Sequence, residues 1–459
     1  MQGVIGVYSK EDVGTKSLYT LYGVQHRGQE SAGVAVAGDR SLRVWSGTGL
    51  VSRVFDERYT PFSHPDDYAV IGCASGESIE GGLPPYVLET ERYKIAITLD
   101  GYIPKKQGES NENAFLNILE EKLQVTSIIP AMRESMWSLP TAYFSLVAVA
   151  LDKKEEESTL IAVRDPRGVR PLHVARTKTK LFLASESAPV DVLEEMGESF
   201  DDRRDVVPGS MIYMNKEGIR EEQVIEPHPA HCAFEWVYFG RPDSVLEGKS
   251  VHVARKNLGH ALVKTHGLKR LYSVEKGPKS YLAIIPVPDS GRSVCTGVAE
   301  GLGVPADEGI IKNAYLGRTY LIYDPSFRKT ASDLKHNVIR ATVGGKKIAI
   351  CDDSIVRGTV SESVAKSLRK AGATEVDYLV SYAPIVNPCF SDPADKPLAA
   401  KPFKGKSIEE IGRLVAKGLP SIDHILYNTP ENVVEAIGLP LEKICTFCIT
   451  GVNPFRKVE

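Results

Sequence analysis

Short runs of apolar residues separated by turn residues dominate the first half of the chain. Runs such as 143–151 (YFSLVAVAL) and 159–165 (TLIAVRD) are typical of buried β-strands. Stretches at 113–123 and after Gly14 have the apolar spacing of amphipathic helices instead. Many strands with few helices predict packed β-sheets flanked by helices. The charged run 153–157 lies between two strand patterns, so we expect it to form a hairpin turn.

The pattern changes after 226–234 (EPHPAHCAF), whose prolines interrupt regular structure. Beyond this segment, apolar strand patterns alternate with helical ones, and that order predicts a parallel sheet with crossover helices. Two further helical patterns, at 408–417 and 430–436, precede a tail that contains CTFC. We therefore expect one domain at 1–230, a second at 231–398, and a C-terminal region at 399–459 that packs on both.

The composition of the 459 residues is that of a globular protein, with 42% apolar residues, 25% charged residues and a formal net charge of −3. This near-neutral balance argues against non-specific nucleic-acid binding and against a membrane-surface protein. No apolar run approaches the roughly 20 residues of a transmembrane helix, and the N-terminus has no secretion-signal pattern. The odd number of cysteines, seven, fits a reducing compartment, so we expect a cytoplasmic protein.

The most informative stretch is 346–361 (KKIAICDDSIVRGTVS). Its strand pattern delivers two adjacent carboxylates, Asp352 and Asp353, to the carboxyl end of the strand, where open α/β sheets bind ligands. A short loop containing Gly358 leads into a helix, whose first N–H groups make an anion site. Carboxylates for a diol beside a site for a phosphate describe a phosphorylated ribose.

This stretch resembles the signature of the type I phosphoribosyltransferases, which use phosphoribosyl pyrophosphate (PRPP). The resemblance implies that Asp352 and Asp353 hold the ribose hydroxyls and Mg²⁺. It also implies a 5′-phosphate loop made of Ser354, Ile355, Val356, Arg357, Gly358 and Thr359.

Two upstream segments look like further parts of the same site. The segment 284–291 (IIPVPDSG) resembles the pyrophosphate loop of these enzymes, in which Asp289, Ser290 and Gly291 are the candidate contacts. The segment 312–321 (KNAYLGRTYL) resembles the loop that closes over PRPP, with Lys312 and Arg318 as candidate catalytic cations. Displacement at ribose C1 passes through an oxocarbenium-like state, so cations must stabilise the departing pyrophosphate while water is excluded.

Taken together, six segments resemble the glutamine PRPP amidotransferase (amidophosphoribosyltransferase) family, in the same order along the chain. They are QHRGQESAG (25–33), GLVSRVF (49–55), RDPRGVRPL (164–172), FEWVYFGRPDS (234–244), KNAYLGRT (312–319) and CDDSIVRGT (351–359). The resemblance implies an N-terminal-nucleophile (Ntn) αββα sandwich joined to a type I phosphoribosyltransferase domain, a parallel sheet with flanking helices. It also implies purine biosynthesis, nucleotide effectors and a homo-oligomer.

The glutaminase half departs from this family at four positions. Gln2 replaces the nucleophilic cysteine, and its carboxamide cannot attack an amide. Asp100 replaces the asparagine of the oxyanion loop, and losing one such donor typically costs about 100- to 1000-fold in rate. Ser75 stands where the family has the arginine that clamps the glutamine carboxylate, and Asn111 lies near the position of the aspartate that binds its amino group. We therefore expect a paralogue that keeps this fold without glutaminase activity.

Four cysteines occur in the contexts that bind a 4Fe-4S cluster in one branch of the same family. They are Cys232, Cys389, Cys445 and Cys448. Structural zinc is the chemical alternative, since four thiolates suit it equally. The three other cysteines lie in strand or helix patterns and are expected to be small buried apolar groups.

Three hypotheses follow. The first is a PRPP-dependent phosphoribosyltransferase that uses ammonia, ammonia from a partner glutaminase, or another small amine. The second is an inactive PRPP- or nucleotide-binding pseudoenzyme that pairs with an active amidotransferase. The third is that the former glutamine pocket binds another metabolite, where Asp100 and Glu112 favour a cation.

Overall fold

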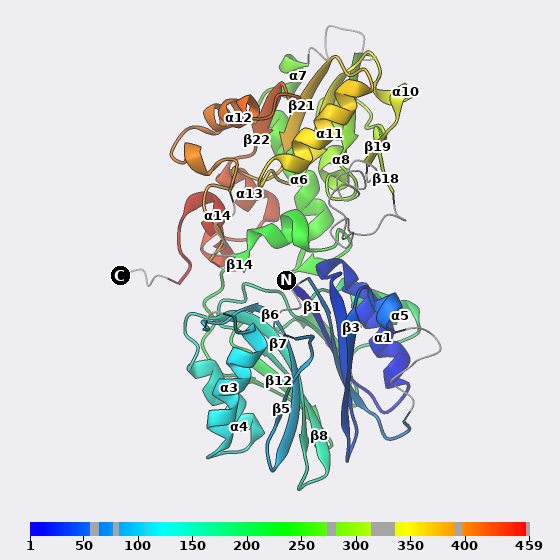
Figure 1. Ribbon diagram of the computed structural model, residues 1–459, viewed down its shortest axis with the longest axis vertical. Helices are drawn as coiled ribbons and strands as arrows, with labels where there is room; N and C mark the ends of the chain where they lie inside the picture. The colour runs from blue at the N-terminus through cyan, green and yellow to red at the C-terminus, as the bar shows by residue number, and fades with distance from the viewer. Residues whose placement is uncertain are drawn as a thin grey trace.

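The protein forms two lobes stacked along its longest axis, as a computed structural model shows (Figure 1). The structure describes residues 1–55, 64–76, 82–106, 108–272, 281–313, 336–390 and 397–455. The N-terminal lobe contains two large sheets, and the C-terminal lobe contains a smaller parallel sheet.

The first sheet of the N-terminal lobe has seven strands, in the order β11-β9-β10-β1-β4-β2-β3. They are β1 (Gln2–Tyr8), β2 (Ser31–Ala37), β3 (Leu42–Thr48), β4 (Ala69–Ser75), β9 (His173–Arg176), β10 (Leu181–Ala184) and β11 (Asp202–Asp205). The outer face packs on α1 (Val13–Gly23), α2 (Val51–Val54) and α5 (Ala188–Glu195). The short helix η1 (Gln25–Arg27) follows α1.

The second sheet has six strands, in the order β13-β12-β8-β7-β6-β5. They are β5 (Tyr86–Glu89), β6 (Tyr93–Tyr102), β7 (Tyr143–Asp152), β8 (Glu157–Arg164), β12 (Ser210–Asn215) and β13 (Gly218–Gln223). Its outer face packs on α3 (Asn111–Leu123) and α4 (Ile128–Trp137), and its inner face packs on the first sheet. Because both faces of β7 are covered, nine of its ten residues are buried, which explains its unbroken apolar pattern.

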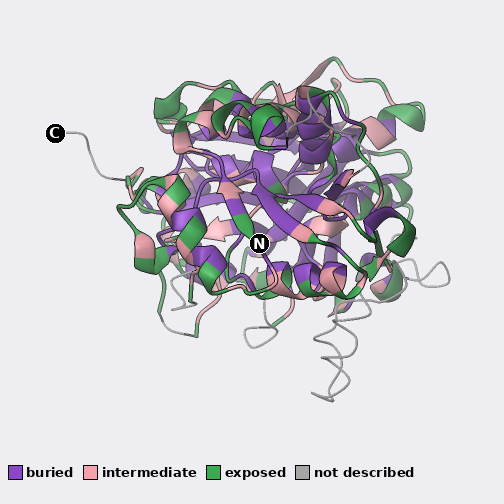
Figure 2. Cartoon of the chain, turned by 90° about the horizontal axis from the view of Figure 1, so that it is seen from above, coloured by how far each residue is buried: buried purple, intermediate pink, exposed green. Residues whose placement is uncertain are grey.

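The C-terminal lobe is built on a parallel sheet in the order β17-β20-β21-β22. Its strands are β17 (Leu282–Pro286), β20 (Lys347–Asp352), β21 (Glu375–Val380) and β22 (His424–Tyr427). Alternate residues face opposite sides: Ile348 and Ile350 pack with α11 (Thr359–Lys370) and α12 (Ile408–Lys417), whereas Ala349 and Cys351 pack with α6 (Val251–Thr265) and α8 (Arg292–Leu302). Seen from above, the buried residues occupy the interior of the molecule, and exposed residues lie around it (Figure 2).

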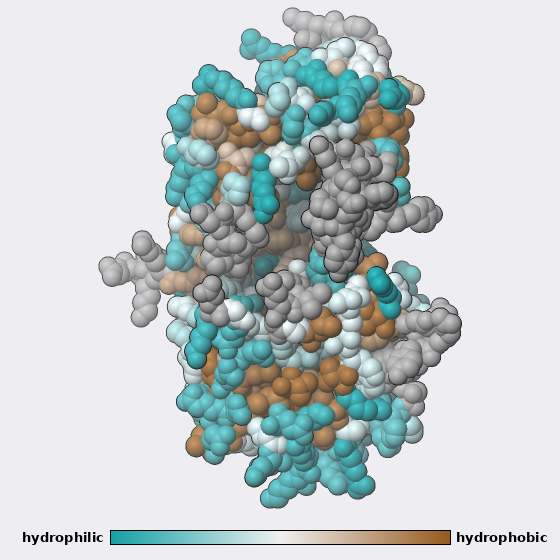
Figure 3. Space-filling model, viewed as in Figure 1, coloured by the Kyte–Doolittle hydropathy of each residue, from teal (hydrophilic) through white to brown (hydrophobic). Residues whose placement is uncertain are grey.

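The remaining elements are short. They are β14 (His231–Cys232), η3 (Glu235–Phe239), β15 (Val245–Leu246), β16 (Lys249–Ser250), α7 (Leu268–Leu271), β18 (Ile310–Lys312), β19 (His336–Val338), α10 (Arg340–Val343), η6 (Lys401–Phe403), α13 (Pro430–Ile437), η7 (Leu441–Lys443), β23 (Ile444–Cys445) and α14 (Phe447–Thr450). On the face that Figure 3 shows, hydrophilic side chains lie among separate patches of apolar groups on both lobes.

Local sequence explains where several helices begin. The Ser407 side chain accepts a hydrogen bond from the Glu410 N–H at the start of α12, and Thr429 does the same for Asn432 in α13. α13 also has Pro430 in its first turn, where a missing N–H costs nothing.

The structure confirms the expected αββα sandwich joined to a parallel sheet with flanking helices. The expected hairpin at 153–157 is also confirmed, since β7 ends at Asp152 and β8 begins at Glu157. The expected helix at 408–417 is confirmed as α12. The segment 399–459 also supplies β22, the fourth strand of the parallel sheet, which the sequence pattern did not predict. β22 has only four residues, too few for an alternating apolar pattern to be recognised in the sequence.

Candidate functional site

The end of β20 places the predicted carboxylate pair at the carboxyl edge of the parallel sheet. Asp352 is the last residue of the strand, and Asp353 begins the loop; each residue is only 6% exposed. The Asp353 N–H donates a hydrogen bond to Asp352 Oδ1 (2.9 Å), and Ser354 Oγ donates to Asp353 Oδ2 (2.5 Å). The loop therefore holds both carboxyl groups in fixed positions.

A buried tyrosine of the next strand completes this pair. The Tyr378 hydroxyl, on β21, donates to Asp352 Oδ2 at 2.7 Å, a contact that sequence reasoning missed. Burial, and next the neighbouring Asp353 carboxylate, raise the pKa of Asp352 well above its usual value. Such a pair favours ligands that bring hydroxyl donors or positive charge, which a ribose diol and a Mg²⁺ ion would supply.

The predicted pyrophosphate loop lies beside the carboxylates. It connects β17 to α8, and Ser290 Oγ lies 3.5 Å from Asp352 Oδ1. Lys312, at the end of β18, places Nζ 2.7 Å from Asp289 Oδ2. A side chain at Gly291 would put its Cβ 2.1 Å from the Cys351 carbonyl oxygen, so only glycine allows the loop to approach β20 this closely. Arg318 lies outside the described residues.

The predicted 5′-phosphate loop, residues 354–359, leads directly into α11. Gly358 has a φ of +83°, the left-handed conformation that glycine adopts without strain, and it precedes the first N–H groups of the helix. Ile355 is buried and anchors the loop, whereas Val356, Arg357 and Thr359 are exposed. The structure thus brings together the described members of the candidate PRPP site.

The four positions that depart from the glutaminase pattern also lie together. Gln2 and Ser75 are register partners on β1 and β4. The Gln2 backbone N–H donates to Asp100 Oδ1 (2.9 Å), and its carboxamide nitrogen donates to Glu112 Oε1 (2.6 Å). Asn111 donates to the Gly101 carbonyl and accepts from the Ile103 N–H, both at 3.1 Å. Gln2 thus bonds to Asp100 and Glu112, whereas Asn111 bonds to the backbone at the end of β6 and just beyond it.

A buried ion network adjoins Asp100 and joins the two lobes. The Arg27 guanidinium contacts Glu186 (2.6 Å), Glu235 (2.9 Å) and Asp100 (3.5 Å). Arg170 contacts Glu235 (3.0 Å) and Asp100 (3.8 Å). Each of these five residues is at most 8% exposed. Sequence reasoning missed this network, although Arg27 and Arg170 lie within QHRGQESAG and RDPRGVRPL, two of the segments that carry the resemblance.

The network lowers the pKa of two of its carboxyl groups, Asp100 and Glu186, whereas burial raises that of Glu235. Burial acts to raise the pKa of Asp100, but Arg170 and Arg27 outweigh it and hold that pKa below its usual value. Burial is likewise outweighed at Glu186, where His26 and Arg27 hold the pKa well below its usual range. An ionised Asp100 only accepts hydrogen bonds, so it cannot donate to a tetrahedral intermediate.

The contacts of Asp100 bear on the hypothesis that a cationic metabolite binds beside Asp100 and Glu112. The two arginines and the N-terminal amino group already act on the Asp100 charge. Glu112 in turn accepts the Gln2 carboxamide. The negative charge of Asp100 is therefore already matched within the chain, whereas Glu112 receives a hydrogen bond from a neutral group.

The four cysteines that the sequence suggests as metal ligands line one cavity. Cys232 and Cys445 are register partners in the parallel pair β14–β23. The Cys448 carbonyl accepts hydrogen bonds from the N–H groups of Val386 and Asn387, both at 3.0 Å. Asn387 is two residues before Cys389 in the sequence. All four line one cavity of about 700 Å³ that also reaches Asp100 and Val356.

This cysteine centre (Cys232, Cys389, Cys445 and Cys448) has the surroundings of a binding site. Burial is the largest cause that raises the pKa of Cys445 to about 11 and that of Cys448 to about 12, so a bound metal would have to displace protons. The buried Tyr143 hydroxyl, in the same cavity, finds no hydrogen-bond acceptor or donor among the described residues. A sulfide-bearing group in the cavity would offer this hydroxyl an acceptor.

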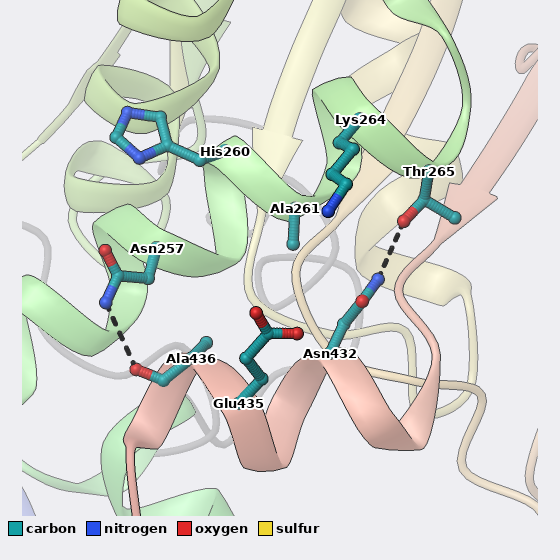
Figure 4. A pocket seen from close by; sticks show the side chains of 8 residues that line it. All are labelled: Asn257, His260, Ala261, Lys264, Thr265, Asn432, Glu435 and Ala436. Atoms are coloured by element: carbon teal, nitrogen blue, oxygen red, sulfur yellow. Dashed lines mark hydrogen bonds between the residues drawn. The ribbon is translucent and has the colours of Figure 1, made fainter.

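A separate cavity of about 490 Å³ lies between α6 and α13 (Figure 4). Its lining is polar, and two hydrogen bonds span it, from Asn257 to the Ala436 carbonyl (3.3 Å) and from Asn432 to Thr265 (2.8 Å). None of the predicted site residues lines it.

A scan against family models finds no match for this chain. The similar proteins that were found are amidophosphoribosyltransferases, and they match along nearly the whole chain. The amidophosphoribosyltransferase of Methanothermobacter thermautotrophicus is 31% identical over 477 residues, covering 98% of this chain and 94% of the relative. That of Synechococcus elongatus is 33% identical over 481 residues, covering 100% of this chain and 92% of the relative. In the described parts of the chain, no helix is long and apolar enough to cross a membrane.

Solved structures agree with the sequence relatives. A structure described as the allosteric regulatory enzyme of purine biosynthesis matches with a TM-score of 0.82 at 28% identity, over 98% of this chain and 96% of that one. The glutamine PRPP amidotransferase from B. subtilis complexed with ADP and GMP matches with a TM-score of 0.81 at 28% identity, over 98% and 97%. With more than 30% identity to curated relatives along nearly its full length, the chain belongs to the amidophosphoribosyltransferase family.

Proposed function

We propose that this protein is a PRPP-dependent phosphoribosyltransferase that uses ammonia or another small amine instead of glutamine. One contrast carries the proposal. The Asp352–Asp353 pair lies at the sheet edge beside the loops expected to bind phosphate and pyrophosphate. The positions that would handle glutamine are instead bonded to one another, Gln2 to Asp100 and Glu112.

In the proposed reaction, Asp352 and Asp353 accept hydrogen bonds from the ribose hydroxyls, and residues 354–359 bind the 5′-phosphate through backbone N–H groups. Lys312 turns from Asp289 to the pyrophosphate. The amine nitrogen forms a bond to ribose C1 as the bond from C1 to the pyrophosphate oxygen breaks. Mg²⁺, held by Asp352 and Asp353, would neutralise charge on the pyrophosphate. With ammonia the product is 5-phosphoribosylamine.

The exclusion of glutamine rests on the chemistry of the replaced groups. Gln2 offers no nucleophile, because a carboxamide cannot attack an amide. Asp100 is held as an anion where the family has a donor, a change expected to cost at least about 100- to 1000-fold in rate. Ser75 supplies no charge for the glutamine carboxylate.

For the cysteine centre we propose a 4Fe-4S cluster rather than zinc. Tetrahedral zinc with Zn–S bonds of about 2.3 Å places its thiolates roughly 3.8 Å apart. Within the described residues, the one group of ligand atoms that all lie within 4.8 Å of one another is Glu375, Asp377 and His424, so no three of the four thiols are that close. Wider spacing suits the larger cluster, whose chemistry in this protein we take to be structural.

The test is a turnover assay on anaerobically purified protein with PRPP and Mg²⁺, measuring pyrophosphate release. We expect release with ammonium and none with glutamine, and we expect Asp352→Asn to abolish it. Release with glutamine, accompanied by glutamate, would refute the loss of glutaminase activity. PRPP binding without turnover on any amine would favour the alternative, a binding pseudoenzyme that partners an active amidotransferase.

A further inference from the structure

A short segment of backbone connects the cysteine centre to the carboxylate pair. We call residues 381–389 the bridge segment. At its first end, the Ser381 N–H donates to the Asp352 carbonyl (3.0 Å), and Ser381 Oγ donates to the Asp353 carbonyl (3.1 Å). At its other end, Val386 and Asn387 donate to the Cys448 carbonyl, and the segment ends at Cys389.

Tyr382 is the residue of the bridge segment that contacts both sites. Its backbone N–H donates to the Asp353 carbonyl at 3.0 Å. Its hydroxyl lies 3.2 Å from Cys448 Sγ. The side chain is fully buried and packs against Phe234, with the ring centroids 5.1 Å apart. Few rotamers are therefore open to it, and its two ends move together.

The direction of the hydrogen bond follows from the state of the sulfur. A cysteine that binds iron does so as a thiolate, which has no proton to donate. The Tyr382 hydroxyl is then the donor and Cys448 Sγ the acceptor. Hydrogen bonds to the sulfurs are among the factors that set the reduction potential of iron–sulfur clusters.

We propose that Tyr382 is a positioning residue that makes the geometry at Asp353 depend on the loaded cysteine centre. The hydroxyl is fixed by the Cys448 sulfur, and the backbone N–H of the same residue fixes the Asp353 carbonyl. This inference rests on the proposed function for its ligand, PRPP, but the contact with Cys448 is measurable without PRPP.

The experiment compares Tyr382→Phe with Tyr427→Phe in the anaerobically purified full chain. Tyr427 is the matched control, because it is also a buried tyrosine of the parallel-sheet region and its hydroxyl has no partner in the part of the chain that the structure describes. Both substitutions remove one oxygen atom and preserve the backbone N–H.

The first measurement is the midpoint potential of the cluster by a redox titration followed by electron paramagnetic resonance. Loss of a donor to sulfur destabilises the reduced, more negative state. We therefore expect the midpoint potential of Tyr382→Phe to lie about 59 mV below that of Tyr427→Phe. This shift corresponds to about a tenfold change in the one-electron equilibrium constant. Equal potentials in the two variants, or a centre that holds zinc without iron, would overturn the proposal.

The second measurement is the PRPP dissociation constant by calorimetry with Mg²⁺. We expect Tyr382→Phe to weaken binding roughly fivefold, the effect of one hydrogen bond, and Tyr427→Phe to bind like the natural protein. Equal affinities in both variants would overturn the dependence of Asp353 on the centre. If the natural protein binds no PRPP but the potential is still shifted in Tyr382→Phe, the proposed function is refuted. The contact between Tyr382 and the cysteine centre is then still supported.

Discussion

Glu186 holds the ion network that joins the lobes, and its replacement by glutamine should be strongly destabilising. Its carboxylate accepts four hydrogen bonds, from His26 Nε2 and Arg27 Nη1 (2.6 Å each) and from the Arg241 N–H and Ser244 Oγ (2.7 Å each). Glutamine keeps one acceptor oxygen and turns an NH₂ group toward the remaining donors. Removing one partner of a buried ion pair costs about 3–5 kcal/mol, so Glu186→Gln should lower the free energy of unfolding by about that amount.

The measurement is urea unfolding at pH 7, followed by tryptophan fluorescence, to which Trp236 contributes from its buried position beside Glu235 at the junction of the lobes. The matched control is Glu156→Gln. Glu156 pairs with Arg40 at 2.7 Å, but their side chains are 51% and 78% exposed, so its loss should cost less than about 1 kcal/mol. Equal losses in the two variants would refute the view that the buried network holds the lobes together.

The same variant makes a prediction about pH. The folded-state pKa of Glu186 lies well below its unfolded value, so its stabilising effect is complete above the unfolded pKa. That contribution disappears as the pH falls from about 4.5 toward the folded-state pKa. The difference between the natural protein and Glu186→Gln should therefore be constant near pH 7 and shrink below about pH 4.5. A difference that grows on acidification would contradict this assignment.

Three further changes test other parts of the site. Gln2→Cys should release no measurable glutamate from glutamine, since Asp100 still lacks a donor worth about 100- to 1000-fold; glutamate release at family-like rates would disprove this. Gly358→Ala and Gly345→Ala should each cost about 1–2 kcal/mol in urea unfolding, because both glycines have positive φ (+83° and +72°), but only Gly358→Ala should weaken PRPP binding in calorimetry. Cys448→Ser should reduce iron from about four atoms per chain to near zero; full iron retention would exclude it as a ligand.

Local motifs made part of the site predictable from the sequence. Asp352 and Asp353 adjoin a strand pattern and a glycine-containing loop, so a few consecutive residues specify both the element and its chemistry. The departures at Gln2 and Asp100 could be recognised because each falls at a position where the family resemblance specifies another residue, the nucleophilic cysteine or the oxyanion-loop asparagine.

The ion network could not be predicted in the same way. Arg27, Asp100, Arg170, Glu186 and Glu235 come from five separate segments, and only the packing of two sheets and the linker brings them together. No periodicity relates such residues, so their pairing depends on tertiary structure alone.

The contacts of the Tyr378 and Tyr382 hydroxyls could not be predicted from the sequence for a related reason. In the sequence they are apolar positions of a strand pattern, 376–384, and a buried tyrosine is most often read as part of the core. Which hydroxyl reaches Asp352 and which reaches Cys448 depends on the register of β21 beside β20 and on the path of the chain after the strand.

The wide spacing of the four cysteines along the chain has a consequence for biogenesis. Cys232 lies near the middle of the sequence, whereas Cys445 and Cys448 lie within its last 15 residues. A ribosome must therefore translate past Cys448 before the four thiols are available together. The N-terminal lobe, whose strands end by Gln223, is able to fold earlier, so filling of the proposed cysteine centre would be a late step that joins an already folded lobe to a newly made one.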